Sequence, residues 1–411
     1  MKNKNVIYAV IVLLVTIIGL WAIPELIKTA TYSRPVYPFG YYSSVKKKFM
    51  FREADKRVEG KLHDDEGVVY EEKAFDAALP LLNFRQLTLN SEMPDSIDGI
   101  KLETNLIRVK QFTSRYTPRS KNTPEIGLYI MYESLPIKGK LESPGDLFRL
   151  TDKMELITAE TNTVNVEKSK RFQDALTKAG FVFPAQWSAG NMSIRKSYDE
   201  GYFSLDAAGK LFHIKMVNGR PFVRNTNLDP QIEPVFFSMT EPADKRFYGF
   251  IFDKKGNCYI LEEGDGKYHP MRLDIDPLDL DRDEMTIMGN FLYWTVTVQN
   301  PEGKHYYALK TETMERVRYY YVEASENKWD VVAGKLFPFY MSFRKTTSEY
   351  IVPQLHFTAY AALITNVLLA LLFTFIYPRR PMKLKIFSGV YVFIFGIAGA
   401  VALLLQWRSK E

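Results

Sequence analysis

Asp206-Ala-Ala-Gly-Lys-Leu-Phe-His-Ile214 is the first of three stretches that align without a gap, and this repetition decides the predicted fold. The other two are Asp253–Leu261 (DKKGNCYIL) and Asn300–Ala308 (NPEGKHYYA). The glycines at the fourth position of each stretch are 47 residues apart in both steps. A period of this length indicates one structural unit repeated along the chain.

Each stretch is typical of a turn between two strands, because an apolar run precedes it and alternating residues follow it. We expect Gly209, Gly256 and Gly303 to supply a positive φ, while the preceding Asp or Asn caps the turn through its side chain. A second hairpin signal also repeats, since Asn218-Gly219 lies 47 residues before Asp265-Gly266. Each unit therefore contains at least three strands.

Two more divergent copies precede these three, at Asp64–Tyr70 and Pro144–Leu150. Their spacing to the next copy is irregular. Two helix-like inserts, Ala74–Leu87 and Val166–Ala179, account for the extra residues. Five units are thus visible in the sequence.

Units of about 40 to 50 residues with four short strands are typical of β-propeller blades. The sequence therefore predicts a mainly β fold, an irregular propeller-like domain with helical inserts. The rival interpretation is a stack of β-meanders, or a sandwich, with coincidental spacing. The recurring aromatic residues Phe212, Tyr259 and Tyr306 are expected to pack between units rather than to contact a ligand.

Three uncharged apolar stretches predict transmembrane helices: Val6–Ile23, Phe357–Tyr377 and Ile386–Trp407. The first could also be a secretory signal, but such signals are shorter and end at a small-x-small cleavage site. We therefore expect a retained anchor. The predicted organisation is an N-terminal anchor (1–30), a β-repeat domain (31–352) and a C-terminal transmembrane hairpin (353–411).

Basic residues predict the orientation in the membrane. Lys2 and Lys4 precede the first span, and the turn Pro378–Lys385 between the last two spans is basic without acids. Lys and Arg accumulate on the cytoplasmic side of membrane proteins. Both segments are assigned to the cytoplasm, which places the central domain outside it.

The two cytoplasmic segments together contain six cations: Lys2, Lys4, Arg379, Arg380, Lys383 and Lys385. Their charge equals the formal net charge of +6, so the central domain is close to neutral. A near-neutral domain has no field for nucleic acid, and we expect no nucleic-acid partner. The single cysteine, Cys258, excludes an intramolecular disulfide. Stability must come from a large core, which the 25 Tyr and 28 Phe can supply.

No catalytic residue can be assigned, and neither a cofactor nor a metal site is expected. The five histidines lack metal-ligand spacing: His63, His213, His269, His305 and His356. The acidic stretch Asp274–Glu284 resembles a calcium loop, but Glu284 stands where the turn needs Gly and Asn290 where a bidentate Glu is needed. We interpret this stretch as a solvated loop between units, with a structural cation as the alternative.

The last apolar stretch carries one packing signal. Gly396 and Ala400, with Gly399 beside them, form a small-xxx-small pattern that allows close helix approach. The partner is either a helix of this chain or another protein. The three spans contain no charged residue, which argues against an ion path through this chain alone.

Several segments resemble an uncharacterised domain-of-unknown-function family of bacterial membrane proteins. They are Leu79–Leu82, Arg85–Leu87, Met93–Ile97 and Gly209–Gly219. The resemblance implies a Gram-negative inner-membrane protein with a periplasmic domain. It also implies an association with ABC transporter components, and it carries over no catalytic residue.

The leading hypothesis is a non-enzymatic periplasmic binding or scaffolding module, accessory to a transporter-like membrane complex. Its expected partners are the lipid bilayer and other inner-membrane proteins, an ABC-type ATPase and permease among them. The alternative is a membrane-anchored periplasmic hydrolase or lyase acting on carbohydrate. A sensor role is disfavoured, because few residues are expected in the cytoplasm.

Overall fold

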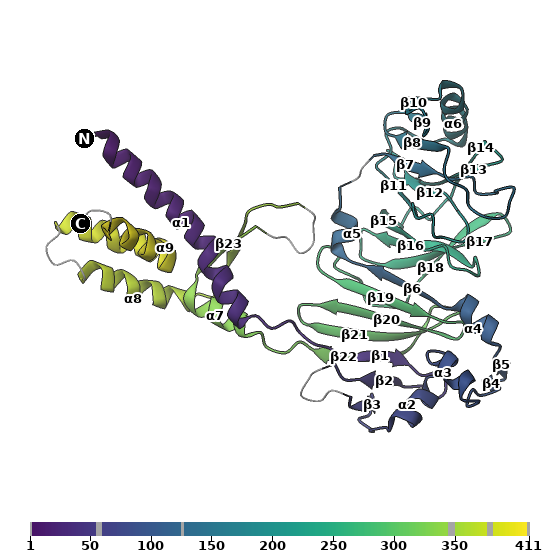
Figure 1. Cartoon of the computed structure of the whole chain (residues 1–411), viewed down its shortest axis with the longest axis horizontal. Coiled ribbons are helices and arrows are strands. Elements are labelled where there is room, and N and C mark those ends of the chain that lie inside the picture. Colours follow the sequence, from purple (N-terminus) through teal and green to yellow (C-terminus); the bar gives the residue numbers. More distant parts are fainter. Residues whose placement is uncertain (1, 55–59, 125–126, 344–349, 376–380, 409–411) are drawn as a thin grey trace. The chain divides into compact units, whose positions relative to one another are not determined.

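The computed structural model describes residues 2–54, 60–124, 127–343, 350–375 and 381–408. The chain divides into two compact units. The strand domain is Tyr37–Glu323, and the helical unit combines Met1–Val36 with Ala324–Glu411. Figure 1 shows the elements of each unit.

The strand domain consists of antiparallel sheets in which neighbouring strands mostly follow one another along the chain. The first sheet is β1 (Phe39–Tyr42), β2 (Phe49–Arg52) and β3 (Leu62–Asp64). The second is β7 (Tyr129–Met131), β8 (Asp146–Leu150), β9 (Met154–Thr158) and β10 (Thr163–Val164). The third is β11 (Trp187–Gly190), β12 (Tyr202–Leu205), β13 (Leu211–Val217) and β14 (Arg220–Asn225).

The fourth sheet is β15 (Pro234–Met239), β16 (Phe247–Asp253), β17 (Cys258–Gly264) and β18 (Lys267–Arg272). The fifth is β19 (Glu284–Gly289), β20 (Tyr293–Asn300), β21 (Gly303–Lys310) and β22 (Arg316–Glu323), with β6 (Phe112–Tyr116) paired to β19. A small hairpin joins β4 (Ser96–Ile97) to β5 (Ile100–Lys101). The helices are α2 (Glu72–Ala78), α3 (Phe84–Leu89), α4 (Thr104–Lys110), α5 (Pro118–Asn122) and α6 (Val166–Ala179).

Apolar clusters lie between successive sheets, so the sheets form a stack (Figure 1). Phe148 of the second sheet and Phe212 of the third share one cluster. Phe203 of the third sheet and Ile251 of the fourth share the next. The fourth and fifth sheets bury a further cluster, and the first sheet packs on the other face of the fifth. Burial on both faces explains why the inner strands β12 and β16 are buried along almost their whole length.

No sheet among the described residues closes into a ring, so the predicted propeller is corrected to an open stack of β-meanders. The segment between β3 and β7 contains α2 to α5 and β6 instead of a simple blade connection. Strand β6 pairs with β19, the first strand of the fifth meander, and so adds a fifth strand at that edge of the sheet. The chain as a whole is mixed α and β rather than mainly β.

The predicted turns are confirmed at most positions. Gly209 and Gly256 connect the second and third strands of their sheets with φ of 76° and 83°. Asn218-Gly219 and Asp265-Gly266 have positive φ at both residues, as a two-residue hairpin requires. Gly303 occupies the same turn but without a positive φ. A Cβ there would lie 2.4 Å from the Val322 carbonyl oxygen, so close approach is what requires the glycine.

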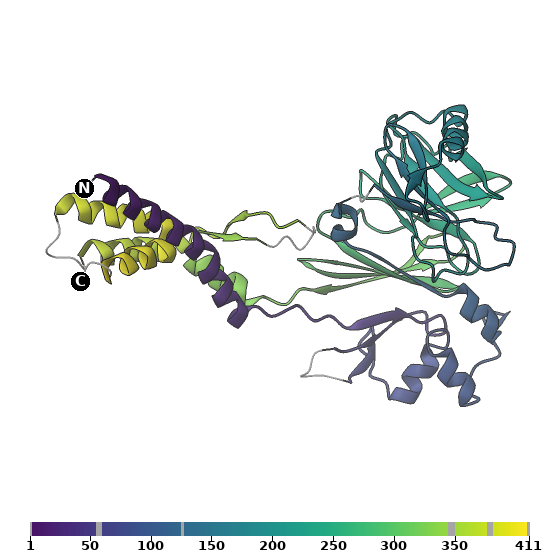
Figure 2. The ribbon, with the colours of Figure 1, turned by 45° about the horizontal axis from the view of Figure 1, so that its top comes forward.

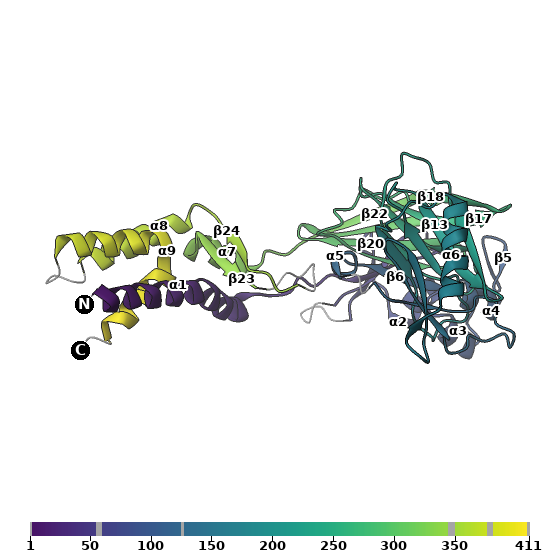
Figure 3. The ribbon, with the colours of Figure 1, turned by 90° about the horizontal axis from the view of Figure 1, so that it is seen from above.

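The Pro144–Leu150 copy is not in register with the later copies. Gly145 precedes β8, whereas Gly209 and Gly256 lie between the second and third strands of their sheets. The predicted helix Val166–Ala179 is confirmed with the same bounds as α6. This helix, labelled in Figure 3, begins at the Asn165 cap and ends at Gly180 with φ of 86°. It packs on β9 and β14. The insert Ala74–Leu87 is instead two short helices, α2 and α3, separated around Pro80.

The helical unit contains α1 (Lys2–Thr31), α7 (Lys328–Leu336), β23 (Phe339–Ser342), β24 (Gln354–Phe357), α8 (Ala362–Phe375) and α9 (Met382–Arg408). Helices α1, α8 and α9 run side by side, as Figure 2 shows. Thr16 of α1 shares a hydrogen bond of 2.7 Å with the Tyr391 hydroxyl of α9. Nearby, a Cβ on Gly19 would lie 3.1 Å from the Ala398 Cβ, so these two helices are closely packed.

Two helices among the described residues are long and apolar enough to cross a membrane, by length and composition: Val6–Thr31 and Met382–Leu405. The third predicted span, Phe357–Tyr377, is corrected. Phe357 ends strand β24, and within the described residues α8 has 14 residues, about 21 Å at 1.5 Å per residue, against a hydrocarbon core of about 30 Å. Tyr377, the predicted end of this span, lies outside the described residues. Arg379 and Arg380 of the basic turn lie outside the described residues.

Gly396 does not form the uninterrupted small-residue face that its spacing predicts. Its φ of 54° and ψ of −135° break α9 at this point. The buried Asn366 of α8 donates a hydrogen bond of 2.8 Å to the Phe393 carbonyl beside the break. Ala400, the second small residue of the predicted pattern, is buried against Phe373 of α8. At this residue the partner is therefore a helix of this chain.

Candidate functional site

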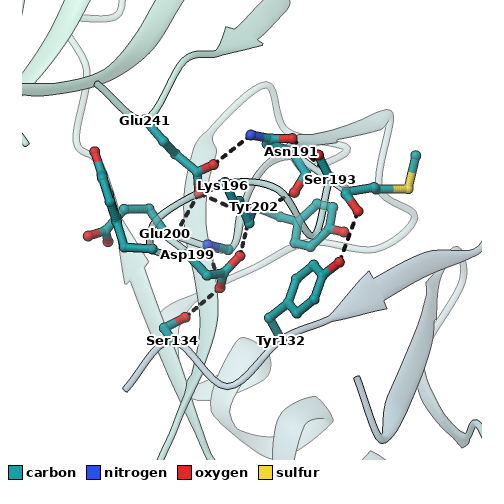
Figure 4. Close-up of polar contacts among 12 residues, drawn as sticks. Tyr132, Ser134, Asn191, Ser193, Lys196, Asp199, Glu200, Tyr202 and Glu241 are labelled. Carbon is teal, nitrogen blue, oxygen red and sulfur yellow. Dashed lines mark hydrogen bonds and ion pairs between the residues drawn. The ribbon is translucent and has the colours of Figure 1, made fainter. Parts of the chain in front are cut away.

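A buried ionic cluster lies where loops from three sheets of the strand domain meet (Figure 4). Ser134 follows β7, Lys196 and Asp199 lie between β11 and β12, and Glu241 lies between β15 and β16. The side chains of Lys196, Asp199 and Glu241 are 5%, 1% and 1% exposed. Charged groups are buried this deeply only where they are paired, so this arrangement is specific to the fold.

Lys196 is the centre of the cluster. Its Nζ donates to Asp199 Oδ1 at 2.5 Å, to Glu241 Oε1 at 3.1 Å and to the Asn191 carbonyl at 2.7 Å. The Tyr132 ring centroid lies 5.1 Å from the same nitrogen. Because an ammonium group has three N–H donors, all of them are engaged. The Lys196 side chain therefore joins Asp199, Glu241 and the Asn191 carbonyl at one point.

Both carboxylates of the cluster receive further hydrogen bonds. Asp199 Oδ2 accepts from Ser134 Oγ at 2.6 Å, and Glu241 accepts from Asn191 Nδ2 at 2.8 Å and from the Glu200 backbone N–H at 2.8 Å. Burial raises the pKa of Glu241, and the nearby Lys196 opposes that rise. The cluster thus combines one cation with two acids and joins three loops.

The loop that carries Glu241 continues directly into a pocket. Tyr198 donates to the Pro242 carbonyl at 2.5 Å, and Lys245 lies 4.5 Å from the Tyr198 ring centroid. Two residues of the same loop, Asp244 and Arg246, line the pocket. The ionic cluster therefore positions the loop that supplies two of the pocket's charged side chains.

This pocket has a volume of about 600 Å³ and lies between the fourth and fifth sheets. It combines charged residues with aromatic rings, and its lining is Lys110, Phe112, Asp244, Arg246, Phe247, Glu262, Glu263, Asn290, Phe291, Trp294, Thr311 and Glu312. Ligand sites typically have such a volume and a few polar groups on an apolar wall. We name this feature the inter-sheet pocket.

Ion pairs organise the inter-sheet pocket. Lys110 Nζ lies 3.0 Å from Asp244 Oδ2, and Arg246 Nε donates to Glu262 Oε1 at 2.7 Å. The guanidinium carbon of Arg246 lies 5.7 Å from the Trp294 ring centroid. The pocket therefore presents donors and acceptors side by side above an aromatic floor.

Two other cavities carry fewer charged groups. One, of about 680 Å³, is lined by turn residues near Gly209 and Asn227, with Lys254 and Glu233 as an exposed ion pair. The other, of about 490 Å³, lies along β11 and β15 and is lined mainly by apolar and small residues. Neither combines paired charges with aromatic rings, so the inter-sheet pocket is the stronger candidate.

The histidines lie apart, and each has its own partner. His63 contacts Glu53, His213 contacts Tyr268, His269 contacts the Gly264 carbonyl, His305 contacts Tyr319 and His356 contacts Ser342. Among the described residues, no group of three or more His, Cys, Asp or Glu could hold a metal ion. Cys258 is buried and free, and burial raises the pKa of its thiol.

The acidic stretch Asp274–Glu284 connects β18 to β19, as expected of a loop between units. It is not simply solvated, however, because Leu273, Ile275, Leu278 and Leu280 alternate with its acids and are buried in the core. Of the recurring aromatics, Phe212 and Tyr306 are fully buried, and Tyr259 is half-buried.

Sequence patterns did not identify the cluster or the pocket. Lys196 and Glu241 are 45 residues apart and belong to no repeated position. The one available signal was weak: both lie in loops at the same end of neighbouring meanders. Only the stacking of the sheets brings them together.

The fold and the site define a stacked antiparallel-sheet domain, inserted between apolar helices and carrying a charged pocket held by a buried ionic cluster. A family model described as Domain of unknown function (DUF4857) matches residues 39–309, and the chain belongs to this family. The matched region runs from β1 into β21 and contains the entire ionic cluster. No curated protein matches the chain.

Proposed function

We propose that this protein is a membrane-anchored binding module. The observation that carries the proposal is the contact between Thr16 and Tyr391, and between Gly19 and Ala398. These contacts join the two apolar helices at opposite ends of the chain into one bundle. The strand domain is an insertion between them, so both of its ends continue into the membrane anchor.

The basic residues support an orientation for this anchor. With Lys2, Lys4 and the turn Pro378–Lys385 in the cytoplasm, the strand domain lies on the opposite side, the periplasm of a Gram-negative inner membrane. Helix α8 is short, so we propose that it and α9 form a hairpin in which α8 occupies part of the membrane thickness. Cysteine labelling of intact cells with a membrane-impermeant reagent tests this orientation. Leu89 is 81% exposed, so Leu89→Cys should be labelled if the strand domain lies outside the cytoplasm. Ser43 is buried, so Ser43→Cys is the control that should stay unlabelled.

Binding is the activity that the inter-sheet pocket supports. Four of its charged side chains already form two ion pairs, Lys110–Asp244 and Arg246–Glu262, and a pre-organised site of this kind loses little freedom when a ligand binds. We propose further that the module is an accessory component of a transporter-like complex, an ABC-type ATPase and permease. The helical unit is the part that would contact such membrane partners.

Affinity purification of the tagged full-length protein from native membranes in mild detergent tests the complex. Recovery of an ATPase and a permease by mass spectrometry supports the accessory role. Recovery of the protein alone removes that role and leaves an independent binding module. Extraction by alkaline carbonate tests the anchor separately, because release of the full-length chain would contradict membrane insertion.

The alternative, a carbohydrate hydrolase or lyase, is favoured by one observation. Asp244, Glu262, Glu263 and Glu312 line the same pocket, and glycosidic chemistry uses pairs of carboxyl groups. Asp244 and Glu262 are paired with cations of the pocket, which suits binding better than proton transfer. Release of reducing ends from oligosaccharides by the purified protein would establish the enzyme instead.

A further inference from the structure

We propose that the inter-sheet pocket binds a neutral, hydroxyl-rich carbohydrate. This inference rests on the proposed binding function and names its ligand class. Carbohydrate recognition needs three properties: a small net field, adjacent donors and acceptors, and an aromatic wall.

The net electrostatic field in the pocket is small because most of its charged side chains form ion pairs. Lys110 is neutralised by Asp244, and Arg246 by Glu262. Glu263 is paired outside the pocket, where Arg224 donates to it at 2.8 Å. Glu312 is the one lining acid without an ion pair among the described residues, and it is exposed, so solvent screens its charge. A charged ligand would gain little Coulomb energy from groups that are already neutralised, and it would have to give up its own hydration. A neutral polar ligand avoids this cost.

The adjacent donors and acceptors follow from the geometry of the pairs. Arg246 uses its Nε towards Glu262 Oε1, which leaves its two Nη groups and Glu262 Oε2 without a partner among the described residues. A sugar hydroxyl donates and accepts at once, so it can bridge a guanidinium and a carboxylate. A carboxylate or phosphate ligand would use the donors alone, and an ammonium ligand the acceptors alone.

The aromatic wall comes from two residues, Phe112 of β6 and Phe291 between β19 and β20, which are half-buried and line the pocket. Trp294 is buried beneath Arg246 and supports its guanidinium group. Pyranose rings carry an apolar C–H face that packs on aromatic rings while their hydroxyls point sideways. Neither of the two other cavities described above is lined by aromatic rings together with both members of an ion pair.

The ionic cluster of Lys196 has a positioning role in this site. Glu241 anchors the start of the loop, Tyr198 holds its middle at Pro242, and Asp244 and Arg246 follow. None of the three cluster residues Lys196, Asp199 and Glu241 lines the pocket. Their substitution should therefore change affinity only through the loop.

The test measures binding of the full-length protein in lipid nanodiscs, because glucoside and maltoside detergents would themselves compete. The probes are immobilised neutral oligosaccharides (maltotriose, cellotriose, tri-N-acetylchitotriose and xylotriose), with trigalacturonate as the anionic probe and glutamine and lysine as amino-acid probes. Hits are quantified by isothermal titration calorimetry. We expect at least one neutral oligosaccharide to bind, and its affinity to fall about tenfold or more in Arg246→Met and Phe291→Ala.

Two variants keep the result interpretable. Glu262→Gln preserves the shape of the pocket and removes one acceptor charge, so it should weaken sugar binding without unfolding the domain. Lys254 lines the separate 680 Å³ cavity, so Lys254→Ala should leave the affinity for the sugar unchanged. Thermal unfolding of each variant separates loss of the site from loss of the fold.

Binding of trigalacturonate or an amino acid in place of neutral sugars, with the same sensitivity to Arg246→Met, would overturn the carbohydrate inference and retain the binding module. Sugar binding that is unaffected by Arg246→Met and Phe291→Ala would place the site elsewhere and overturn the inference for this pocket. Absence of binding to every probe would also overturn it. The anchor and the complex are judged separately, by carbonate extraction and affinity purification.

Discussion

Lys196 and Glu241 form an ion pair of 3.1 Å in which the two side chains are only 5% and 1% exposed. The pair joins the loop between β11 and β12 to the loop between β15 and β16. Asp199, bound to the same lysine, extends the connection to Ser134 after β7. Three successive sheets are therefore tied at one end by a polar network, while apolar clusters hold them along their faces.

Removing the cation from this network should be costly. Lys196→Met would leave Asp199 and Glu241 buried without a counter-charge, and breaking a buried pair typically costs about 3–5 kcal/mol. Glu241→Gln should cost clearly less, because burial already raises the pKa of Glu241 and an amide carries no charge to desolvate. Urea unfolding of the nanodisc-embedded protein, followed by tryptophan fluorescence, measures both.

Lys138→Met is the matched control, since its side chain is 82% exposed and its partner Glu142 is 57% exposed. An exposed pair contributes at most about 1 kcal/mol, so this variant should unfold with the native protein. If Lys196→Met unfolded with it too, the cluster would have no structural role.

The buried His213 should make stability depend on pH. Burial, together with the charges of Lys215 and Arg224, lowers its pKa to about 3, and the hydrogen bond with the Glu200 carbonyl opposes this shift. The imidazole is neutral in the folded state, whereas the unfolded chain takes up a proton below about pH 6.5. This contribution is complete above that pH and is lost as the pH falls towards 3, by up to about 1.4 kcal/mol per pH unit.

The measurement is the free energy of unfolding of the native protein and of His213→Gln between pH 7.5 and pH 5. The variant should be less stable at pH 7.5, because it disturbs the bonds to Tyr268 and to the Glu200 carbonyl. Its stability should also decline less on acidification. His269→Gln, at an exposed position, should follow the native pH profile, and identical slopes for all three proteins would refute the assignment.

Local features of this fold could be predicted from the sequence because short-range physics determines them. Asn218-Gly219 and Asp265-Gly266 form the hairpins that their φ preferences favour. Helix α6 has an Asn cap, an amphipathic pattern and a terminal glycine, and its bounds were correct. The 47-residue period identified the third, fourth and fifth sheets.

Long-range features could not be predicted. Strand β6 pairs with β19, some 170 residues later, and nothing in Phe112–Tyr116 identifies that partner. The repeat alone is equally compatible with a ring and with an open stack. The third apolar stretch was misassigned because hydropathy does not distinguish the strand residue Phe357 from the helix that begins at Ala362. Lys196 and Glu241 meet only after the sheets have stacked.

Two glycines of the repeat should differ in their tolerance of substitution. Gly209 and Gly256 share a positive φ, so an alanine at either position costs roughly 1–2 kcal/mol of backbone strain. Space surrounds Gly209, but a Cβ on Gly256 would lie 2.1 Å from the Leu278 carbonyl oxygen. Gly256→Ala should therefore destabilise the domain by about 2–5 kcal/mol, as strain and overpacking add. Equal losses in urea unfolding would contradict the close approach of Leu278.

The bundle of the helical unit predicts a specific cross-link. A Cβ on Gly19 would lie 3.1 Å from the Ala398 Cβ, close to the separation of about 3.5–4.5 Å found in disulfides. Gly19→Cys combined with Ala398→Cys should therefore oxidise readily in native membranes, and the natural Cys258 is buried and should not compete.

A protease site inserted at the exposed Ile137 makes the product visible, because only the cross-linked chain stays intact on a non-reducing gel after cleavage. Gly19→Cys with Leu405→Cys, at an exposed position of α9, is the matched control and should fall into two fragments. If both pairs cross-linked equally, or neither did, α1 and α9 would not pack as described, and the proposed anchor would lose the observation on which it rests.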